Sequence, residues 1–253
     1  MSNSLMFRAN YGLDAPGVVA ALSIGGLACI LMGFLFRILG GPQHSVLVIS
    51  VFVSGVSAGG VMLFGAAVML WSSKFGKLLE RRRLIRSLQI KEHENILDVG
   101  CGRGLLLIEA AKYLKSGKAI GVDLWQSRDL SGNTAEAALM NAGVENVAER
   151  VEIRTGDMRS LPIENDSVDV VVSSLAIHNI PTREGRVQAI EEISRVLRPG
   201  GRLALLDLHC THEYAGTLRR LGWWQVERSG LIFLFFHPVR VVYGTKPKRP
   251  NWG

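Results

Sequence analysis

The sequence predicts a doubly wound, mostly parallel α/β domain preceded by two membrane-length apolar helices. Three observations predict it. Two long uncharged runs occupy the first 73 residues, short β-rich runs alternate with helical ones after Ile90, and the first of those runs leads into the glycine-rich motif ILDVGCGRG at 96–104. Apolar strands that alternate with helices are typical of a parallel sheet covered on both faces.

The distribution of charged residues divides the chain near residue 73 into an apolar part and a part of ordinary mixed sequence. Between Asp14 and Lys74 the only charged residue is Arg37, whereas mixed charged and apolar sequence follows Lys74. The runs at 17–39 and 46–71 each reach the roughly 20 apolar residues that a helix needs to cross a bilayer. We expect an N-terminal segment, a transmembrane hairpin, a basic amphipathic helix leaving the membrane and a globular domain, at residues 1–15, 16–73, 74–90 and 91–253.

The turn of the hairpin is expected at GGPQHS, residues 40–45, because glycine and proline interrupt helices. A signal peptide is the alternative for the first apolar run. Its apolar region is usually about 7 to 15 residues long and ends at a small-residue cleavage site, which is not evident before the second run. We therefore expect a multi-pass membrane protein.

The net charge of +7 is concentrated just after the hairpin. Six basic residues and one glutamate lie between Lys74 and Arg86, whereas residues 87–245 contain slightly more acidic than basic side chains. Basic residues beside a span favour the cytoplasmic side and attract anionic headgroups, although a solvated helix face would look the same. The globular body lacks the basic surface of a nucleic-acid-binding protein, so we expect a cytoplasmic domain without a nucleic-acid partner.

The cysteines Cys29, Cys101 and Cys210 lie far apart in the sequence and show neither disulfide nor metal-ligand spacing. We expect no metal site. Reduced thiols also fit a cytoplasmic domain.

The globular part alternates strands and helices in order. The expected strands are five short β-rich runs, at 96–99, 119–122, 151–154, 168–172 and 203–207. The expected helices lie at 105–114, 134–141 and 186–197, the last of which ends at RPGG. A short helix after Thr211 and two strand-like runs, at 231–236 and 239–243, complete the domain.

The glycine loop lies where such a sheet binds ligands, at the carboxyl ends of its strands. It follows Asp98 in the pattern G-x-G-x-G, which differs from the G-x-G-x-x-G of dinucleotide sites. Asp123 ends the next strand, where a carboxylate can accept ribose hydroxyls, and Asp157 ends the third. Each carboxylate alone could cap a helix or turn, but three at successive strand ends indicate one site.

This combination resembles the class I S-adenosylmethionine-dependent methyltransferases over about residues 94–246. The run LPIENDSVDVVVSS at 161–174, followed by a histidine and by RVLRPGG, is similar to the small-molecule subgroup that includes methyltransferases of quinone and sterol biosynthesis. The resemblance implies a seven-stranded Rossmann-like sheet and S-adenosyl-L-methionine as the cofactor. The Asn-Pro-Pro-Tyr element of methyltransferases that act on amide or adenine nitrogens is absent, and LAIHNIP stands in its place.

The resemblance also implies which residues contact the cofactor. They are Asp98, Gly100, Cys101, Gly102, Gly104, Asp123, Leu124, Asp157, Met158, Ser173 and Ser174. The glycine loop would lie against the methionine moiety, with Asp98 orienting its amino end. Asp123 would bind the ribose hydroxyls and Asp157 the adenine amino group, with Leu124 and Met158 beside the base. The two serines would edge the pocket of the donor methyl.

Two histidines are candidate catalytic bases. His178 follows the fourth strand and His209 follows the fifth, and imidazole is the side chain whose ordinary pKa lies nearest neutrality. Either could equally be a packing or capping residue. Much methyl transfer needs only alignment, because the sulfonium is already a strong electrophile.

Three functions fit these features. The first is a membrane-anchored methyltransferase of a lipid or hydrophobic small molecule, which we favour because anchoring concentrates a membrane-dissolved acceptor. The second is a tethered methyltransferase of a protein or soluble small molecule, and the third is a non-catalytic S-adenosylmethionine-binding membrane protein. The acceptor and the methylated atom stay open. Removal of residues 1–73 is expected to spare cofactor binding.

Two apolar features concern the membrane. Small residues recur at four-residue spacing on both spans, at Gly25, Cys29, Gly33, Gly55 and Gly59. Such faces let helices approach closely in lipid, so they are expected to join the two spans and could also join chains into a homo-oligomer. Near the C-terminus, Trp223, Trp224 and the run at 231–236 are expected either in the core or as a lipid-facing wall.

Overall fold

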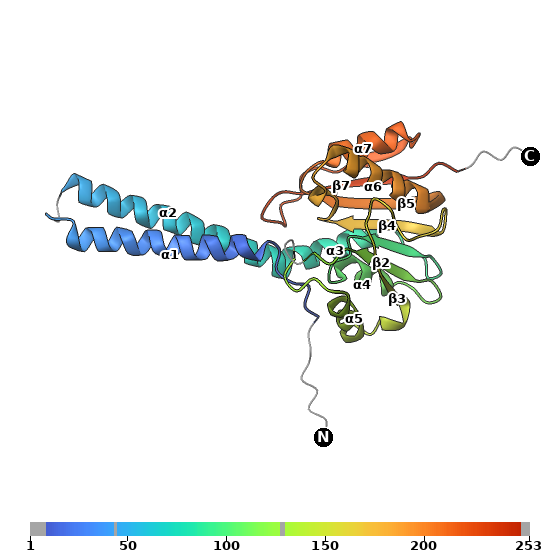
Figure 1. Ribbon diagram of the computed structural model, residues 1–253, viewed down its shortest axis with the longest axis horizontal. Helices are drawn as coiled ribbons and strands as arrows, with labels where there is room; N and C mark the ends of the chain where they lie inside the picture. The colour runs from blue at the N-terminus through green and yellow to red at the C-terminus, as the bar shows by residue number, and fades with distance from the viewer. Residues whose placement is uncertain (1–8, 43–44, 127–129, 249–253) are drawn as a thin grey trace, which may run out of the picture.

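The computed structural model describes residues 9–42, 45–126 and 130–248, so part of the expected 40–45 turn lies outside the described residues. Helices α1 (Pro16–Leu39) and α2 (Val46–Trp71) form a long hairpin that projects from an α/β domain (Figure 1). Both helices are long and apolar enough to cross a membrane.

Glycines set the distance between the two helices of the hairpin. A Cβ atom on Gly55 would lie 2.8 Å from the carbonyl oxygen of Cys29 and 3.1 Å from the Cα of Gly33. One on Gly59 would lie 2.5 Å from the carbonyl oxygen of Gly26. Only glycine permits so close an approach of two backbones. The small residues therefore pack the two helices of one chain against each other, as expected.

Helix α2 continues through a π-helical turn, Ser72–Gly76, into helix α3 (Lys77–Ser87). The prediction that the basic residues of this helix lie on the membrane surface is wrong for Lys77 and Arg81, whose side chains are buried at 3% and 4% exposure. Their charges are matched inside the domain, where Arg81 Nε lies 3.2 Å from Glu109 Oε2. The basic residues of this region that stay exposed are Lys74, Arg82, Arg83 and Arg86.

The domain contains a seven-stranded sheet in the order β3-β2-β1-β4-β5-β7-β6. The strands are β1 (Ile96–Val99), β2 (Ala119–Asp123), β3 (Val151–Thr155), β4 (Val168–Ser174), β5 (Leu197–Asp207), β6 (Gln225–Arg228) and β7 (Arg240–Thr245). Strands β1 to β5 are parallel, whereas β7 runs antiparallel between β5 and β6. The order reverses between β1 and β4, so the crevice at the carboxyl ends of these strands is the expected ligand site.

Helices cover both faces of this sheet, which confirms the doubly wound architecture. They are α3, α4 (Leu105–Ala111), α5 (Ala135–Val144), α6 (Arg183–Val196) and α7 (Thr211–Arg220). Short 3-10 turns occupy Ala148–Arg150 and Ile177–Asn179.

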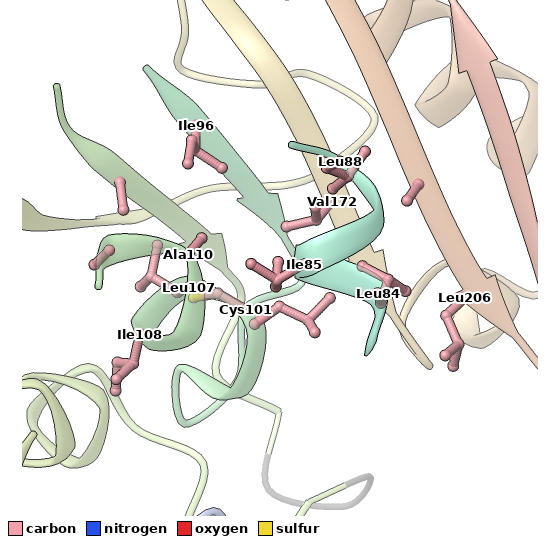
Figure 2. Close-up of a cluster of buried hydrophobic side chains, with 14 of the residues drawn as sticks. Leu84, Ile85, Leu88, Ile96, Cys101, Leu107, Ile108, Ala110, Val172 and Leu206 are labelled. Atoms are coloured by element: carbon pink, nitrogen blue, oxygen red, sulfur yellow. The ribbon is translucent and has the colours of Figure 1, made fainter. Parts of the chain in front are cut away.

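Helix α3 belongs to the core of the domain. Figure 2 shows Leu84, Ile85 and Leu88 packed beside Leu107 of α4 and Val172 of β4. Burial of a leucine or isoleucine side chain contributes about 1.5 to 3 kcal/mol. The hairpin is therefore joined to the domain by a packed helix and not by a free linker.

The run at 231–236 does not form the expected strand. A single bridge joins Ile232 to Val239, and the sheet instead gains β6, whose mostly polar sequence QVER gave no strand signal. Only part of the run is covered, because Ile232 and Phe235 pack in the domain core while Leu231 and Phe233 are exposed. The backbone N–H of Phe236 donates to Ser72 Oγ at 3.1 Å, and the Phe236 ring packs against residues of α1 and α2.

Candidate functional site

The glycine loop after β1 bends around a cavity of about 410 Å³. Gly100, Gly102 and Gly104 have φ angles of +71°, +52° and +83°, a region that other residues rarely adopt. A Cβ atom on Gly100 would also collide with the side chain of Ala176. The loop therefore needs glycine for its conformation and for the space it leaves at the cavity wall.

Asp98 lines this cavity at the end of β1. Its side chain is buried, and one carboxylate oxygen accepts the backbone N–H of Leu107 at 2.9 Å. Burial raises the pKa of Asp98 to about 7; the hydrogen bond from Leu107 opposes this rise and the charge of Asp123 adds to it. Burial also raises the pKa of the Cys101 thiol, which stays neutral. The cavity thus holds a carboxyl group that titrates near neutral pH.

Asp123 ties the glycine loop to the end of β2. One carboxylate oxygen accepts the Gly102 N–H at 2.8 Å, and the other accepts the Trp125 N–H at 2.7 Å and an Asn133 amide N–H at 3.3 Å. Asn133 is a cavity residue that sequence reasoning missed, because it lies in a loop without a motif. Its buried amide oxygen has no hydrogen-bond partner in the described part of the chain.

Four further expected residues line the same cavity, namely Leu124, Asp157, Met158 and Ser174. The Arg159 guanidinium donates to both carboxylate oxygens of Asp157, at distances between 2.5 and 3.0 Å. These bonds hold the pKa of Asp157 below its ordinary value. Asp157 is therefore ionised and oriented at neutral pH.

Three expected site residues lie elsewhere. Ser173 is buried, and its hydroxyl donates to the carbonyl oxygen of Val99 at 2.7 Å, so it joins β4 to β1 and does not edge the cavity. Successive side chains of a strand point to opposite faces, so two adjacent serines cannot both face one pocket. Gly104 and His209 also lie outside the cavity lining.

His178 lines the cavity from the 3-10 turn after β4. Its ring atom Nδ1 lies 2.6 Å from Oδ1 of Asp207, and its backbone N–H donates to Oδ2 at 3.1 Å. The side chains of His178 and Asp207 are 20% and 2% exposed. Sequence reasoning selected His178 but missed Asp207, which the fold brings to it from the end of β5.

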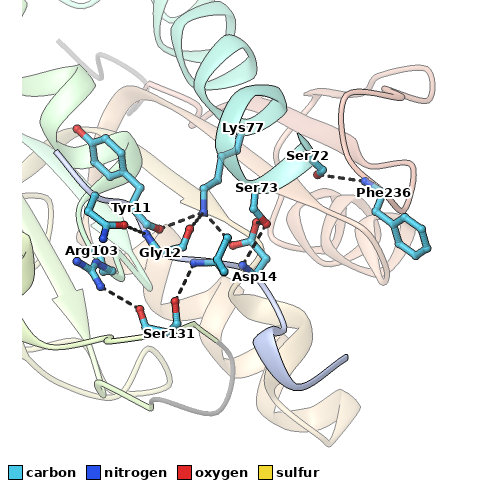
Figure 3. A network of polar contacts seen from close by, with 11 residues as sticks. Tyr11, Gly12, Asp14, Ser72, Ser73, Lys77, Arg103, Ser131 and Phe236 are labelled. Atoms are coloured by element: carbon cyan, nitrogen blue, oxygen red, sulfur yellow. Dashed lines mark hydrogen bonds and ion pairs between the residues drawn. The ribbon is translucent and has the colours of Figure 1, made fainter. Parts of the chain in front are cut away.

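The segment 9–15, here called the strap, connects the hairpin to the cavity (Figure 3). Lys77 of α3 donates from Nζ to the carbonyl oxygens of Tyr11 and Gly12, at 3.0 and 2.8 Å, and to Asp14 Oδ1 at 3.1 Å. These three acceptors use all three donors of the ammonium. Lys77 and several strap residues line the cavity.

The strap also contacts the far side of the cavity. The Leu13 N–H donates to Ser131 Oγ at 2.8 Å, and Arg103 of the glycine loop donates to the Ser131 carbonyl oxygen at 3.0 Å. The Asp14 N–H donates to Ser73 Oγ at 3.1 Å. Sequence reasoning missed the strap because its contacts join residues 59 and 118 positions apart, which no local pattern encodes.

Residues 97–205 match the family described as the methyltransferase domain. This chain contains a methyltransferase domain. The matched segment includes the glycine loop, Asp123, Asp157 and His178, and it ends within β5.

Two curated relatives resemble the methyltransferase domain over part of their length. The demethylmenaquinone methyltransferase of Lactobacillus johnsonii is 30% identical over 145 residues, which are 56% of this chain and 54% of that protein. The sterol 4-C-methyltransferase of Caenorhabditis elegans is 29% identical over 131 residues, which are 52% of this chain and 36% of that protein. The chain thus spans about half the length, or less, of these relatives.

A solved structure supports the fold. The S-adenosylmethionine-dependent methyltransferase from Aquifex aeolicus superposes with a TM-score of 0.54 at 18% identity, over 72% of this chain and 97% of that one. At this identity the likeness shows the methyltransferase fold.

The cavity of the methyltransferase domain fits S-adenosyl-L-methionine, the cofactor implied by this fold and these relatives. Its volume is in the range of small-ligand sites. The glycine loop leaves backbone accessible at the wall, and Asp98 and Asp123 present carboxylates to a ligand that has ammonium and hydroxyl groups. The unpartnered amide oxygen of Asn133 is a further acceptor at the same wall.

Proposed function

We propose that this chain is a membrane-anchored methyltransferase that acts on a lipid or hydrophobic small molecule at the cytoplasmic face of a membrane. One observation supports this most strongly. The cavity that is lined by Gly100 and Asp123 is also lined by Ala15, which directly precedes α1, and by Phe235 of the loop between β6 and β7. The cofactor site and the base of the hairpin thus belong to one cavity.

Length and exposure support a membrane environment for the hairpin. Helices α1 and α2 contain 24 and 26 residues. At a rise of about 1.5 Å per residue they span about 36 and 39 Å, more than the roughly 30 Å of a bilayer core. Only 11% of the most apolar window of each helix is buried within the chain, far less than in the core helix of a soluble domain. Such exposed apolar surface needs a lipid or protein partner.

The exposed basic residues support a cytoplasmic domain. Lys74, Arg82, Arg83 and Arg86 lie directly after α2, where positive charge favours the cytoplasmic side. With Lys77 and Arg81 buried in the domain, attraction to anionic headgroups rests on these four exposed charges, each of which contributes about 1 kcal/mol near the membrane surface.

The loop between β6 and β7 supports a hydrophobic acceptor. Leu231 and Phe233 are 48% and 72% exposed, while Phe235 is buried against the cavity. The loop therefore offers apolar side chains from the hairpin base to the cavity. Of the two tryptophans, Trp223 is buried in the core and Trp224 is exposed, so only Trp224 is available to such a wall.

The names of the two relatives agree with such an acceptor. One is a demethylmenaquinone methyltransferase and the other a sterol methyltransferase. Quinones with isoprenoid tails and sterols are both membrane-soluble. We extend this substrate class, and not a particular compound, to the present chain.

The cofactor, when bound, supplies an electrophilic methyl group on sulfur. The residues proposed to hold it line the cavity, and they are Asp98, Gly100, Cys101, Gly102, Asp123, Leu124, Asn133, Asp157, Met158 and Ser174. Asp123 can accept a ribose hydroxyl at Oδ2 in addition to the Gly102 N–H, because each carboxylate oxygen accepts two hydrogen bonds. The strap and the glycine loop would together exclude water and align the acceptor, which is the main demand of this reaction.

The test uses the full-length protein in vesicles made from a total membrane lipid extract. After incubation with methyl-labelled S-adenosylmethionine, label should enter the organic-solvent extract at a rate that depends on the protein. Asp123→Ala should reduce this rate at limiting cofactor. Label found only in protein would instead support the tethered protein methyltransferase. Cofactor binding without any transfer would support a non-catalytic binder.

A further inference from the structure

We propose that Asp207 positions His178 as a general base, and that the acceptor therefore belongs to the class that loses a proton when it is methylated, such as a phenol, an enol or another hydroxyl compound. The inference rests on the proposed methyl transfer and narrows its substrate class. It is supported by the geometry around Asp207, a residue that the sequence did not select.

Asp207 is a buried carboxylate that is fixed by four contacts. It is 1% exposed. Oδ2 accepts the His178 N–H at 3.1 Å and the Tyr214 hydroxyl at 3.0 Å, while Oδ1 accepts the Leu208 N–H at 2.8 Å and lies 2.6 Å from His178 Nδ1. A buried carboxylate is costly unless it is hydrogen-bonded, and these contacts satisfy both oxygens. Asp207 is therefore held in one orientation beside the imidazole.

The imidazole of His178 is placed between this carboxylate and the cavity. Nδ1 lies close enough to Oδ1 for a hydrogen bond from a neutral imidazole or an ion pair from a protonated one, although the Nδ1–H does not point straight at the oxygen. The χ2 torsion of histidine is soft, so a small rotation completes the hydrogen bond. The opposite nitrogen, Nε2, faces away from Asp207 and has no hydrogen-bond partner among the described residues. Because His178 lines the cavity, Nε2 can accept a proton from an acceptor there.

The proposed step balances without an added reagent. The acceptor oxygen forms a bond to the methyl carbon while the carbon–sulfur bond breaks and leaves its electron pair on sulfur. The acceptor proton moves to Nε2 of His178, and Asp207 stabilises the imidazolium that results. His178 afterwards releases this proton to water.

The chemistry of the pair indicates the class of acceptor. A tertiary amine or a thioether has no proton to lose and becomes a permanent cation, so a base beside it gives no advantage. A hydroxyl group is a weak nucleophile until its proton leaves, and help from a general base typically contributes about 10²- to 10⁴-fold. An acceptor with an O–H group is therefore the one that this arrangement serves.

Other titratable and charged groups surround the pair, in the turn after β5, on α6 and on α7. They are His209, Cys210, Tyr214, Arg186 and Glu213. Burial raises the pKa of Cys210 and of Tyr214, so both stay neutral, and Arg186 and Glu213 form an ion pair at 3.1 Å. His209 is a second imidazole close to the pair, with its ring centroid 6.5 Å from that of His178. His209→Ala therefore belongs in the test.

The test compares rates of label transfer into vesicle lipid by full-length variants. At mildly alkaline pH, His178→Gln should lower the rate by about 10²- to 10⁴-fold and Asp207→Asn by about tenfold or more. His212→Ala, which changes an exposed histidine of α7, is the matched control and should leave the rate unchanged. Calorimetric affinity for S-adenosylmethionine should be retained in every variant, which shows that the fold and the cofactor site are intact.

The pH profile separates a positioning role from a structural one. For the parent protein, the logarithm of the rate plotted against pH should fall at acidic pH with a slope of one, as expected when a single proton inactivates the base. Asp207→Asn should shift this acidic limb to lower pH, because the anion that stabilises the imidazolium is gone. If Asp207→Asn fails to fold, Tyr214→Phe keeps the carboxylate but removes one of its hydrogen bonds, so the limb should move to higher pH. His209→Ala should leave the limb in place.

Two results would overturn the proposal. One is a His178→Gln rate close to that of the parent, and the other is a labelled product that mass spectrometry identifies as a quaternary ammonium or sulfonium compound. Absence of label from the lipid with the parent protein contradicts the proposed function instead. In that case the same variants are compared on the fraction that does receive label, so the role of Asp207 is still decided.

Discussion

Replacing Lys77 with methionine should open the strap over the cavity. The change keeps an unbranched side chain but removes the ammonium that donates to Tyr11, Gly12 and Asp14. A hydrogen bond to a charged group contributes about 1.5 to 3 kcal/mol. The net loss is much smaller than three such bonds, because burial of the Lys77 ammonium is itself costly and lowers its pKa, and because the Asp14 side chain is 34% exposed and water can replace part of its contact. We expect the strap to lose about 2 to 3 kcal/mol of local stability, which is about a 30- to 150-fold increase in its open population.

Hydrogen exchange followed by mass spectrometry measures this directly. The strap amides of Leu13 and Asp14, which donate to Ser131 and Ser73, should exchange faster by about that factor, whereas amides of the central strands should not change. Affinity for S-adenosylmethionine should fall as well, because the strap lines the cavity. Lys74→Met, which changes an exposed lysine one turn earlier, is the control. Strap exchange in Lys77→Met equal to that of the parent would refute the assigned role of the network.

The strap also changes the expectation for a shortened protein. Removal of residues 1–73 takes away the strap together with the hairpin, so it should weaken cofactor binding, contrary to the expectation from sequence. Replacement of residues 16–71 by a short flexible linker keeps the strap. The linker can be short because Asp14 and Ser73 are in contact.

Three further changes test separate parts of the account. Asp123→Ala should weaken S-adenosylmethionine binding by about 1.5 to 3 kcal/mol in calorimetry, since it removes the proposed ribose acceptor and frees the Gly102 N–H, and unchanged affinity would exclude this role. Binding should strengthen as the pH rises to about 7, where Asp98 ionises, and then level off. The dependence, at most about tenfold per pH unit, should vanish in Asp98→Asn. Replacing Gly55 and Gly59 with leucine should force the hairpin helices apart and lower the melting temperature, and light scattering on the parent decides whether the chain is also an oligomer.

The parallel half of the sheet could be predicted because its strands are buried on both faces. All four residues of β1 are buried, and β4 is nearly so, which is why both are rich in apolar residues, with Asp98 and Asp169 as their charged residues. The run at 231–236 looks similar in sequence but is only partly buried, because Phe236 packs against the hairpin while Leu231 and Phe233 are exposed. An apolar run therefore does not by itself establish a buried strand. Strand β6 has a single buried residue, Val226, and therefore gave no signal.

Site residues could be predicted from the sequence where a local motif, such as an aspartate at the end of a strand, defines their place in the fold. Asp98 and Asp123 lie at the carboxyl ends of β1 and β2, which meet in any parallel sheet with this pairing, so their approach follows from topology. Asp207 and Lys77 act through partners that only the tertiary fold supplies. Asp207 lies 29 positions from His178, and Lys77 lies more than 60 from the strap residues that it holds.

The central claim is that the hairpin gives a membrane-dissolved acceptor access to the cofactor cavity. It is tested most directly by one ratio, the initial rate of methylation of lipid in vesicles divided by the rate on the same lipid extract dispersed in detergent micelles. The ratio is measured for the full chain and for the variant in which a short linker replaces residues 16–71. The variant should keep its S-adenosylmethionine affinity and its rate on micelles but lose most of its rate on vesicles, so its ratio should fall steeply. A ratio equal to that of the full chain, with both rates intact, would contradict the claim.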